Sequence, residues 1–205
     1  MEKPGSDEAR GSSGSERGAA SAEERRPIVF FSEQRWDASD RARELSTRFA
    51  KQRPVVVLER PARAEPGVPD SWDLQFPMRR LLVGRPVLRR GTAVASPRLV
   101  RMIQQLFHWQ DVGEWVAWLE APGSLPLARC LSPRLVVYDR PSGPAARPAD
   151  ERPADAALVR AADVLFVGAR GPWDGLAAHM LAELAKAERF RGRPSIRGPE
   201  LEASG

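Results

Sequence analysis

The sequence has a single cysteine, Cys130, and only two histidines, His108 and His179. One cysteine excludes an intrachain disulfide framework and a zinc site built from clustered cysteines. Two histidines that lie far apart in the sequence also argue against a histidine-rich metal site. We therefore expect no bound metal ion.

Long apolar runs are absent as well. No run approaches the roughly 18 residues that a bilayer-spanning helix needs, and the N-terminus lacks the apolar segment of a secretory signal. We therefore expect a cytoplasmic protein.

Lysine is scarce, since Lys3, Lys51 and Lys186 are the only three among 32 basic residues. The net charge is +5 and the pI about 10.2, but arginine, alanine and proline are all abundant, as is typical of a GC-rich genome. The high pI is thus weak evidence for a polyanionic partner, and we expect no binding to nucleic acid.

Several catalytic and cofactor-binding motifs are also missing. The absence of a Walker P-loop and of GxGxxG after the first predicted strand argues against ATP hydrolysis and dinucleotide binding. There is no GxSxG nucleophile elbow, and no Asp-x-Asp pair to hold a divalent metal on a nucleotide sugar. The sequence therefore predicts no cofactor.

Composition divides the chain into a domain and two tails. Residues 1–26 contain almost nothing apolar larger than alanine, and residues 191–205 are similar. Such segments bury too little apolar surface to offset their ordering entropy, so we expect both to be disordered. Residues 27–190 are long enough for one domain that buries roughly 70% of the surface of its unfolded chain.

Short apolar runs within this domain alternate with helical patterns. The runs predict buried strands, at 28–31, 55–58, 115–119, 135–138 and 164–167. Apolar spacing predicts helices, from near Asp37 to Ala50 and at 98–109, 125–131, 156–162 and 173–190. Between them, 73–78 and 92–95 are candidate short strands, with apolar pieces at 81–83 and 87–88, and 141–155 is a predicted loop. This order predicts a single Rossmann-like α/β domain, an open and mostly parallel sheet with helices on both faces.

In such folds, ligands bind beyond the carboxyl ends of the strands, where the strand order reverses. The segments that follow the predicted strands are therefore candidate parts of a site. They are 32–37, 59–61, 120–124, 139–143 and 168–175.

The first of these segments carries Glu33, Arg35, Trp36 and Asp37 as candidate substrate-binding residues. Arg35 can pair with a phosphate, and Trp36 can stack on a sugar or a lipid. The alternative is that Asp37 caps the following helix while Trp36 packs on the rim of the domain. Ser39 and Asp40 are further candidate caps.

Asp139 directly follows a predicted buried strand and is the candidate catalytic residue. It can accept a hydrogen bond from a substrate hydroxyl or act as a base. The alternative is a structural aspartate that pairs with Arg134 or Arg140.

The turn from Gly168 to Gly175 follows the last predicted strand and opens a helix. Its backbone amides, helped by Arg170, can hold a phosphate. A nucleotide-binding protein that uses this turn is a third possibility for function, and a plain flexible turn is the structural alternative.

Residues 76–90 mix apolar side chains with five arginines. Such a segment can lie on anionic lipid, where each basic residue contributes about 1 kcal/mol. Peripheral contact with the inner face of the membrane is thus one prediction. The alternative is a pair of short strands with their arginines on the solvent side.

Three pieces of sequence, taken in order, resemble the N-terminal half of GT-B glycosyltransferases, particularly the family-4-like enzymes of bacterial cell-surface polysaccharide synthesis. The pieces are IVFFSEQRWDASDRARELSTRFAKQRPVVVLERP from residue 28, WVAWLEAPGSLPLARCLSPRLVVYDRPSG from residue 115, and LVRAADVLFVGA from residue 158. The sequence departs from the family after Tyr138-Asp139, where Arg-Pro-Ser-Gly replaces an acidic segment.

The resemblance implies the acceptor-binding half of an enzyme that transfers a sugar from a nucleotide donor to a carbohydrate or lipid-linked acceptor. The family's donor domain, with two glutamates eight residues apart, has no counterpart in residues 27–190. We therefore expect a chain that is inactive alone and needs a partner protein that supplies a donor domain. The alternative is a non-catalytic regulatory module that docks on a partner glycosyltransferase.

Overall fold

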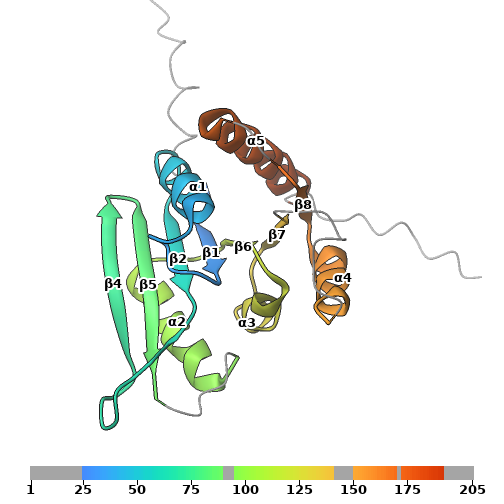
Figure 1. Ribbon diagram of the computed structural model, residues 1–205. Coiled ribbons are helices and arrows are strands. Elements are labelled where there is room, and N and C mark those ends of the chain that lie inside the picture. The colour runs from blue at the N-terminus through green and yellow to red at the C-terminus, as the bar shows by residue number, and fades with distance from the viewer. Residues whose placement is uncertain (1–24, 90–94, 141–149, 170–171, 192–205) are drawn as a thin grey trace, which may run out of the picture.

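Eight strands pair into one sheet in the computed structural model, which describes residues 25–89, 95–140, 150–169 and 172–191 (Figure 1). The strands are β1 (Ile28–Ser32), β2 (Val55–Glu59), β3 (Ala62–Arg63), β4 (Ser71–Met78), β5 (Leu81–Leu88), β6 (Val116–Leu119), β7 (Leu135–Arg140) and β8 (Val164–Val167). The helices are α1 (Asp40–Ala50), α2 (Pro97–Trp109), α3 (Leu125–Cys130), α4 (Arg152–Ala161) and α5 (Trp173–Arg191), with a 3₁₀ turn η1 (Pro122–Ser124) before α3.

The strand order is β3-β5-β2-β1-β6-β7-β8, and β4 pairs with β5. All pairs are parallel except β4 with β5. From the central β1 the chain first builds outward through β2 and β5, then returns to the other side of β1 through β6, β7 and β8. Counted along the chain, these six strands have the 3-2-1-4-5-6 order of the Rossmann fold. The predicted single, mostly parallel Rossmann-like domain is therefore confirmed.

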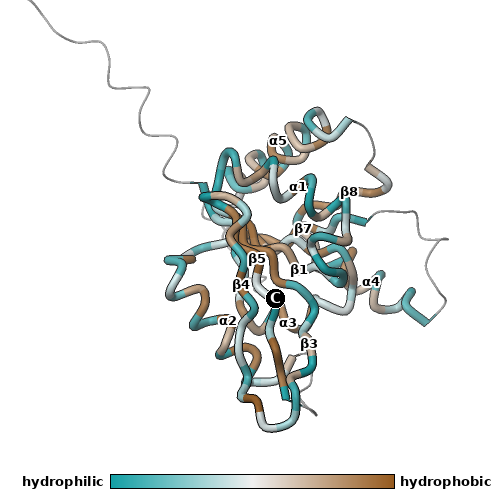
Figure 2. Tube along the Cα trace, turned by 60° about the vertical axis from the view of Figure 1, so that its left-hand side comes forward, coloured by the Kyte–Doolittle hydropathy of each residue, from teal (hydrophilic) through white to brown (hydrophobic). Residues whose placement is uncertain are grey.

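Helices cover both faces of this sheet. In β1, Ile28 and Phe30 point to one face, and Val29 and Phe31 point to the other, because side chains alternate along a strand. The first face packs against α1 and α5, and the second against α2, α3 and α4 (Figure 1). Figure 2 shows the hydrophobic traces of the central strands gathered between the more hydrophilic helices.

An aromatic cluster fixes β1 against β6 on the α1 face. The ring of Phe30 lies 5.8 Å from that of Phe49 and 5.3 Å from that of Trp118, measured between centroids. Phe166 on β8 also stacks on Trp118, with ring centroids 5.7 Å apart. This packing ties β1, β6 and β8 together across one face of the sheet, where β1 and β6 are neighbours and β7 lies between β6 and β8.

Helix α1 begins as its sequence predicts. The N-cap is Ser39, whose hydroxyl accepts a hydrogen bond from the Ala42 backbone N–H at 3.2 Å. Leu45 and Phe49, four residues apart, are fully buried against the sheet. Of the three predicted cap candidates, the structure therefore confirms Ser39.

Helix α5 is tied to the body of the domain by a charged pair. The guanidinium of Arg53 donates hydrogen bonds to both carboxylate oxygens of Glu188, at 3.1 and 3.2 Å. The Arg53 side chain is only 3% exposed and that of Glu188 only 12%. Breaking one partner would leave a charge away from water, so this pair is important for keeping α5 in place.

Two segments differ from the prediction. The pieces expected at 73–78, 81–83 and 87–88 are one antiparallel hairpin of two eight-residue strands, β4 and β5, while 92–94 lies outside the described residues. Helix α4 begins at Arg152, within the predicted loop. Pro153 occupies the first turn of this helix. Proline is tolerated there, since the first backbone N–H groups of a helix have no partner within it. Cys130, at the end of α3, is exposed.

The hairpin also separates the arginines of the basic segment. Arg79 and Arg80 lie in the turn between β4 and β5, whereas Arg89 follows the far end of β5. An eight-residue strand at roughly 3.3 Å per residue spans about 26 Å. Arg79 and Arg80 are therefore far from Arg89, Arg90 lies outside the described residues, and contact with a membrane stays a prediction. Among the described residues, no helix is both long and apolar enough to cross a bilayer.

Candidate functional site

The strand order reverses between β1 and β6, and a cavity of about 320 Å³ opens beyond the carboxyl ends of these strands. This is where ligands bind in open α/β sheets. The cavity is lined by residues that follow β1 and β6, by one residue near the end of β7, and by the start of α1. They are Glu33, Gln34, Ser39, Arg41, Glu120, Ala121 and Asp139.

A bidentate ion pair forms one wall of this cavity. Arg41, in the first turn of α1, donates from Nε to Asp139 Oδ2 at 2.8 Å and from Nη2 to Oδ1 at 2.5 Å. Its third donor, Nη1, reaches the backbone carbonyl of Ala169 at 2.9 Å. The Asp139 side chain is fully buried, while that of Arg41 is 19% exposed. The pair joins α1, β7 and the segment after β8, and it fixes the cavity wall in one geometry.

Glu120 is a carboxyl group of the cavity whose pKa is raised into the neutral range. It follows β6 directly, and its Oε2 accepts a hydrogen bond from the Ser32 hydroxyl at 3.2 Å. Removal from water, reinforced by the negative charge of Asp139, raises the pKa of Glu120 to about 7. Ser32 and Arg41 oppose this rise, and Glu33 adds to it. A glutamate near its own pKa at neutral pH can both accept and donate a proton.

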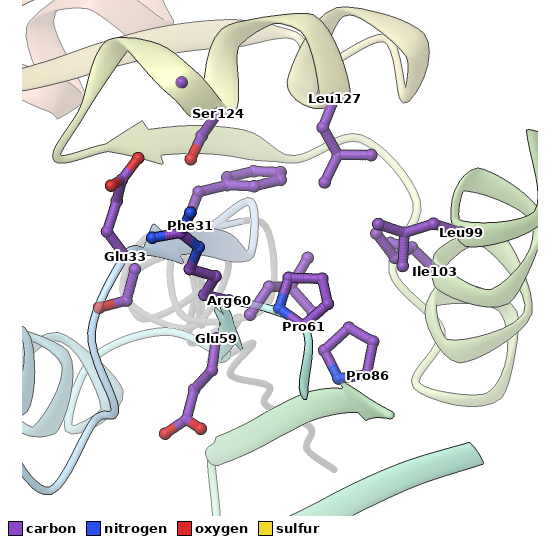
Figure 3. Close-up of a pocket in the computed structure, with 13 residues that line it drawn as sticks. Phe31, Glu33, Glu59, Arg60, Pro61, Pro86, Leu99, Ile103, Ser124 and Leu127 are labelled. Atoms are coloured by element: carbon purple, nitrogen blue, oxygen red, sulfur yellow. The ribbon is translucent and has the colours of Figure 1, made fainter. Parts of the chain in front are cut away.

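A second, more apolar cavity of about 140 Å³ lies beside the first and shares Glu33 with it. Figure 3 shows Leu99 and Ile103 of α2 and Leu127 of α3 on one side of this pocket, and Glu33 on the other. The remaining lining residues come from the ends of β1, β2 and β5 and from η1. They are Phe31, Ser32, Leu58, Glu59, Arg60, Pro61, Pro86, Gly123 and Ser124.

Gly123 makes room for the carboxylate shared by the two cavities. A Cβ at this position would lie 3.0 Å from Glu33 Oε1, which is tighter than an ordinary contact. A glycine in η1 therefore lets Glu33 lie against this turn, between the polar and the apolar cavity.

The two cavities together are acidic, although the whole protein is basic. They are lined by four carboxylates, Glu33, Glu59, Glu120 and Asp139, against two guanidinium groups, Arg41 and Arg60. Arg41 and Asp139 neutralise each other, which leaves Glu33, Glu59 and the partly ionised Glu120 against Arg60. The site therefore suits hydroxyl groups or cations and opposes an anionic ligand such as a diphosphate.

The structure places the predicted site residues in different surroundings. Glu33 and Asp139 line the same cavity. Asp139 pairs with Arg41 and not with its neighbour Arg140, which instead pairs with the buried Asp155. The predicted pairing of Asp139 with Arg140 is wrong, because adjacent residues of a strand point to opposite faces of the sheet. A catalytic role of Asp139 stays a prediction.

Arg35, Trp36 and Asp37 of the first loop lie outside both cavity linings. Arg35 donates two hydrogen bonds to the exposed carboxylate of Asp37, at 3.0 and 2.9 Å, and this contact lowers the pKa of Asp37. Trp36 packs on the α1 face of the core. Its indole N–H donates to Ser46 Oγ at 2.9 Å, and its backbone N–H donates to Glu59 Oε1 at 2.6 Å. Ligand contacts of Arg35, Trp36 and Asp37 therefore stay predictions.

Arg170 lies outside the described residues. Gly168 has a positive φ of 59°, which favours glycine, and its N–H donates to the Arg140 carbonyl at 2.8 Å. The first turn of α5 carries the acidic Asp174, which repels an anion at that helix end. Phosphate binding by this turn and by Arg170 stays a prediction.

Glu120 and Arg41 line the cavity but are not among the site residues predicted from the sequence. Glu120 stands directly after its strand, and it lies within the predicted site segment 120–124. Arg41 carries a weaker signal, a cation in the first turn of the helix that follows the central strand. Within the described part of the chain, no group of three or more histidine, cysteine or acidic residues is placed to hold a metal ion.

No protein-family model matches the sequence, and the search of curated proteins finds no match. Among solved structures, the chain is similar to a sucrose-phosphate synthase from Thermosynechococcus elongatus. The sequence identity is 14% and the TM-score 0.49, and the match covers 80% of this chain and 99% of that one. The likeness concerns the fold. Membership in the family-4-like glycosyltransferases stays a prediction.

Proposed function

We propose that this chain is the acceptor-binding half of a nucleotide-sugar-dependent glycosyltransferase of the GT-B type. The acceptor is a carbohydrate or a lipid-linked carbohydrate, and its reacting hydroxyl lies against Glu120 in the cavity between β1 and β6. The observation that carries the proposal is a glutamate with a pKa of about 7 at the reversal of strand order.

Glu120 is suited to act as a general base. Near pH 7 a large fraction of it is ionised, yet it still holds a proton well enough to take one from a hydroxyl as the bond to that oxygen forms. In the proposed step the acceptor oxygen attacks the anomeric carbon of the donor sugar while its proton passes to Glu120. The bond from that carbon to the diphosphate breaks, and the nucleoside diphosphate leaves with the bonding electrons.

The rest of the cavity supplies hydrogen bonds for the other hydroxyls of a sugar. Glu33 is an acceptor, Gln34 offers both donors and acceptors, and Ser39 lies at the N-cap of α1. The Arg41–Asp139 pair holds this wall rigid. We assign Asp139 and Arg41 to positioning, and we retain Asp139 as the competing candidate for the base.

The charge of the site supports the acceptor side of the reaction and not the donor side. Four carboxylates against two guanidinium groups repel the diphosphate of a sugar nucleotide. The donor must therefore be presented by another domain or by a partner protein, and the chain alone is expected to be inactive in transfer.

Binding measurements by NMR on the full chain test this proposal. Methyl glycosides of common hexoses and N-acetylhexosamines are the probes for the acceptor, and uridine diphosphate is the probe for the donor. We expect amide shifts at Ser32, Glu33 and Ala121 with at least one glycoside and none there with uridine diphosphate. Uridine diphosphate bound in this cavity, with no glycoside bound, would overturn the proposal.

The pH dependence of glycoside binding separates the two candidate bases. If the Glu120 carboxylate accepts the hydrogen bond of the ligand hydroxyl, affinity rises with pH through about 7, and Glu120→Gln abolishes that dependence. In Asp139→Asn the dependence should persist with a lower midpoint, because the nearby negative charge is removed. An unchanged pH profile in Glu120→Gln would assign the role to another group.

A non-catalytic module that docks on a partner glycosyltransferase is the second candidate. The observation that favours it is the edge strand β8, where Leu165 is 40% and Val167 49% exposed. Exposed apolar side chains on a strand edge are typical of a surface that another chain covers. This candidate predicts binding to a partner that Glu120→Gln leaves unchanged and Leu165→Glu weakens.

A further inference from the structure

The apolar pocket next to the proposed acceptor cavity has a definite size and chemistry. Its volume is about 140 Å³, close to the roughly 150 Å³ of an apolar protein cavity that binds benzene. Its apolar lining includes Phe31, Leu99, Ile103 and Leu127, all of which are at most 6% exposed. The pocket therefore matches a group of about six carbon atoms and is too small for a complete lipid chain.

One side of the pocket is polar and adjoins the acceptor cavity. Ser32 and Glu33 lie on β1 and directly after it, and Glu33 lines both cavities. In Figure 3, Leu99, Ile103 and Leu127 lie on one side of the pocket, and Glu33 and Glu59 lie on the other. One ligand with an apolar end and a hydroxyl-bearing end can therefore occupy both cavities at once.

The pocket walls are rigid before any ligand arrives. Pro61 and Pro86 supply two of its sides, and proline has a fixed φ and few conformations to lose on binding. Leu99 and Ile103 are one turn apart on α2, a thirteen-residue helix capped by Ser96. A preformed pocket of this kind loses little entropy when it is filled.

We propose that the acceptor is amphipathic and that this pocket binds its apolar group, an aromatic ring or a short branched alkyl group of about six carbons. The hydroxyl-bearing part of the same molecule then lies at Glu120. This inference rests on the proposed function and adds a class of acceptor to it, a glycoside with a compact apolar aglycone.

Paired probes test the pocket on the full chain. Each methyl glycoside is compared with the phenyl glycoside of the same sugar, and phenol is used alone as a probe of the pocket. We expect intermolecular NOEs from phenol to the methyl groups of Ile103 and Leu127. We also expect the phenyl glycoside to bind at least about tenfold more tightly than its methyl counterpart, which is about 1.4 kcal/mol.

A variant that fills the pocket provides a second, independent test of the proposal. Ile103→Phe adds volume inside the pocket, and Gln104→Phe adds the same ring at an exposed position of the same helix. The preference for phenyl over methyl glycosides should disappear in Ile103→Phe and persist in Gln104→Phe. If Ile103→Phe does not fold, the phenol NOEs and the paired affinities of the unaltered chain still test whether the pocket binds an apolar group.

The failure of this inference differs from the failure of the proposed function. Equal affinities for phenyl and methyl glycosides, with no phenol NOEs, would overturn the apolar subsite while leaving carbohydrate binding at Glu120 intact. Phenol NOEs without any glycoside shifts near Glu120 would overturn the proposed function, and with it the amphipathic acceptor.

Discussion

Replacing Glu120 by glutamine should stabilise the protein, and by an amount that depends on pH. Glutamine keeps the shape of the side chain and an oxygen that can accept from Ser32, but it cannot ionise. The pKa of Glu120 is about 7 in the folded chain, against an ordinary value of 4.5. Between these two values the unfolded chain loses the proton that the folded chain keeps, so stability falls as pH rises.

The magnitude follows from the size of this shift. Each pKa unit corresponds to about 1.36 kcal/mol. The unfolding free energy of the unaltered protein therefore falls by up to about 3 kcal/mol by pH 8 and by only about 1 kcal/mol by pH 5. Glu120→Gln escapes this loss. We therefore expect its free energy of unfolding to exceed that of the unaltered protein by up to about 3 kcal/mol at pH 8, and by much less at pH 5.

Urea denaturation of both proteins at pH 5, 6, 7 and 8 measures the difference. Glu65→Gln is the matched control, because Glu65 is an exposed glutamate in the loop between β3 and β4. Its substitution should leave the unfolding free energy almost unchanged at every pH. A difference between Glu120→Gln and the unaltered protein that is constant across this range would refute the reasoning, since it would mean that burial and Asp139 do not raise the pKa of Glu120.

Three further substitutions test the surrounding structure. Asp139→Asn leaves the partly buried Arg41 without its carboxylate, so we expect a loss of about 3–5 kcal/mol in urea denaturation; a loss below 1 kcal/mol would show that the pair is solvated. Arg53→Met removes the partner of Glu188 and should speed amide exchange in α5 more than in α2, and uniform exchange would contradict the proposed tie. Ser39→Ala removes the α1 cap and should cost about 1 kcal/mol of unfolding free energy, whereas no loss would mean that water replaces the hydroxyl.

Much of the site could be located from the sequence, because strand ends are visible in it. Apolar runs indicate β1, β6 and β7, and the carboxyl ends of parallel strands meet at one edge of a sheet. Glu33 and Asp139 follow two such runs, and the structure brings both to one cavity. Glu120 lay in a predicted site segment, but nothing in its neighbours along the chain indicates that it is removed from water.

The pairing of Asp139 with Arg41 could not be predicted from neighbouring residues in the sequence. The two residues are 98 positions apart, and sequence proximity suggested Arg140 instead. A strand sends adjacent side chains to opposite faces, so Arg140 turns toward Asp155 while Asp139 turns toward α1. Proline gave a similar error in α4, where Pro153 indicated a loop although it stands in the first turn of a helix.

The sequence by itself determined most of the strands and helices, apart from β3, the β4–β5 hairpin and the start of α4, because apolar periodicity and capping residues such as Ser39 act over a few neighbouring positions. It also determined the fold class, since strands that alternate with helices can bury their apolar faces in few ways. Only the tertiary structure decided which strand ends are neighbours and how deeply Glu120 is buried. Those two facts set the charge and the pKa of the site, because electrostatic interactions depend on distances through space and on exclusion of water, and neither is encoded in local sequence.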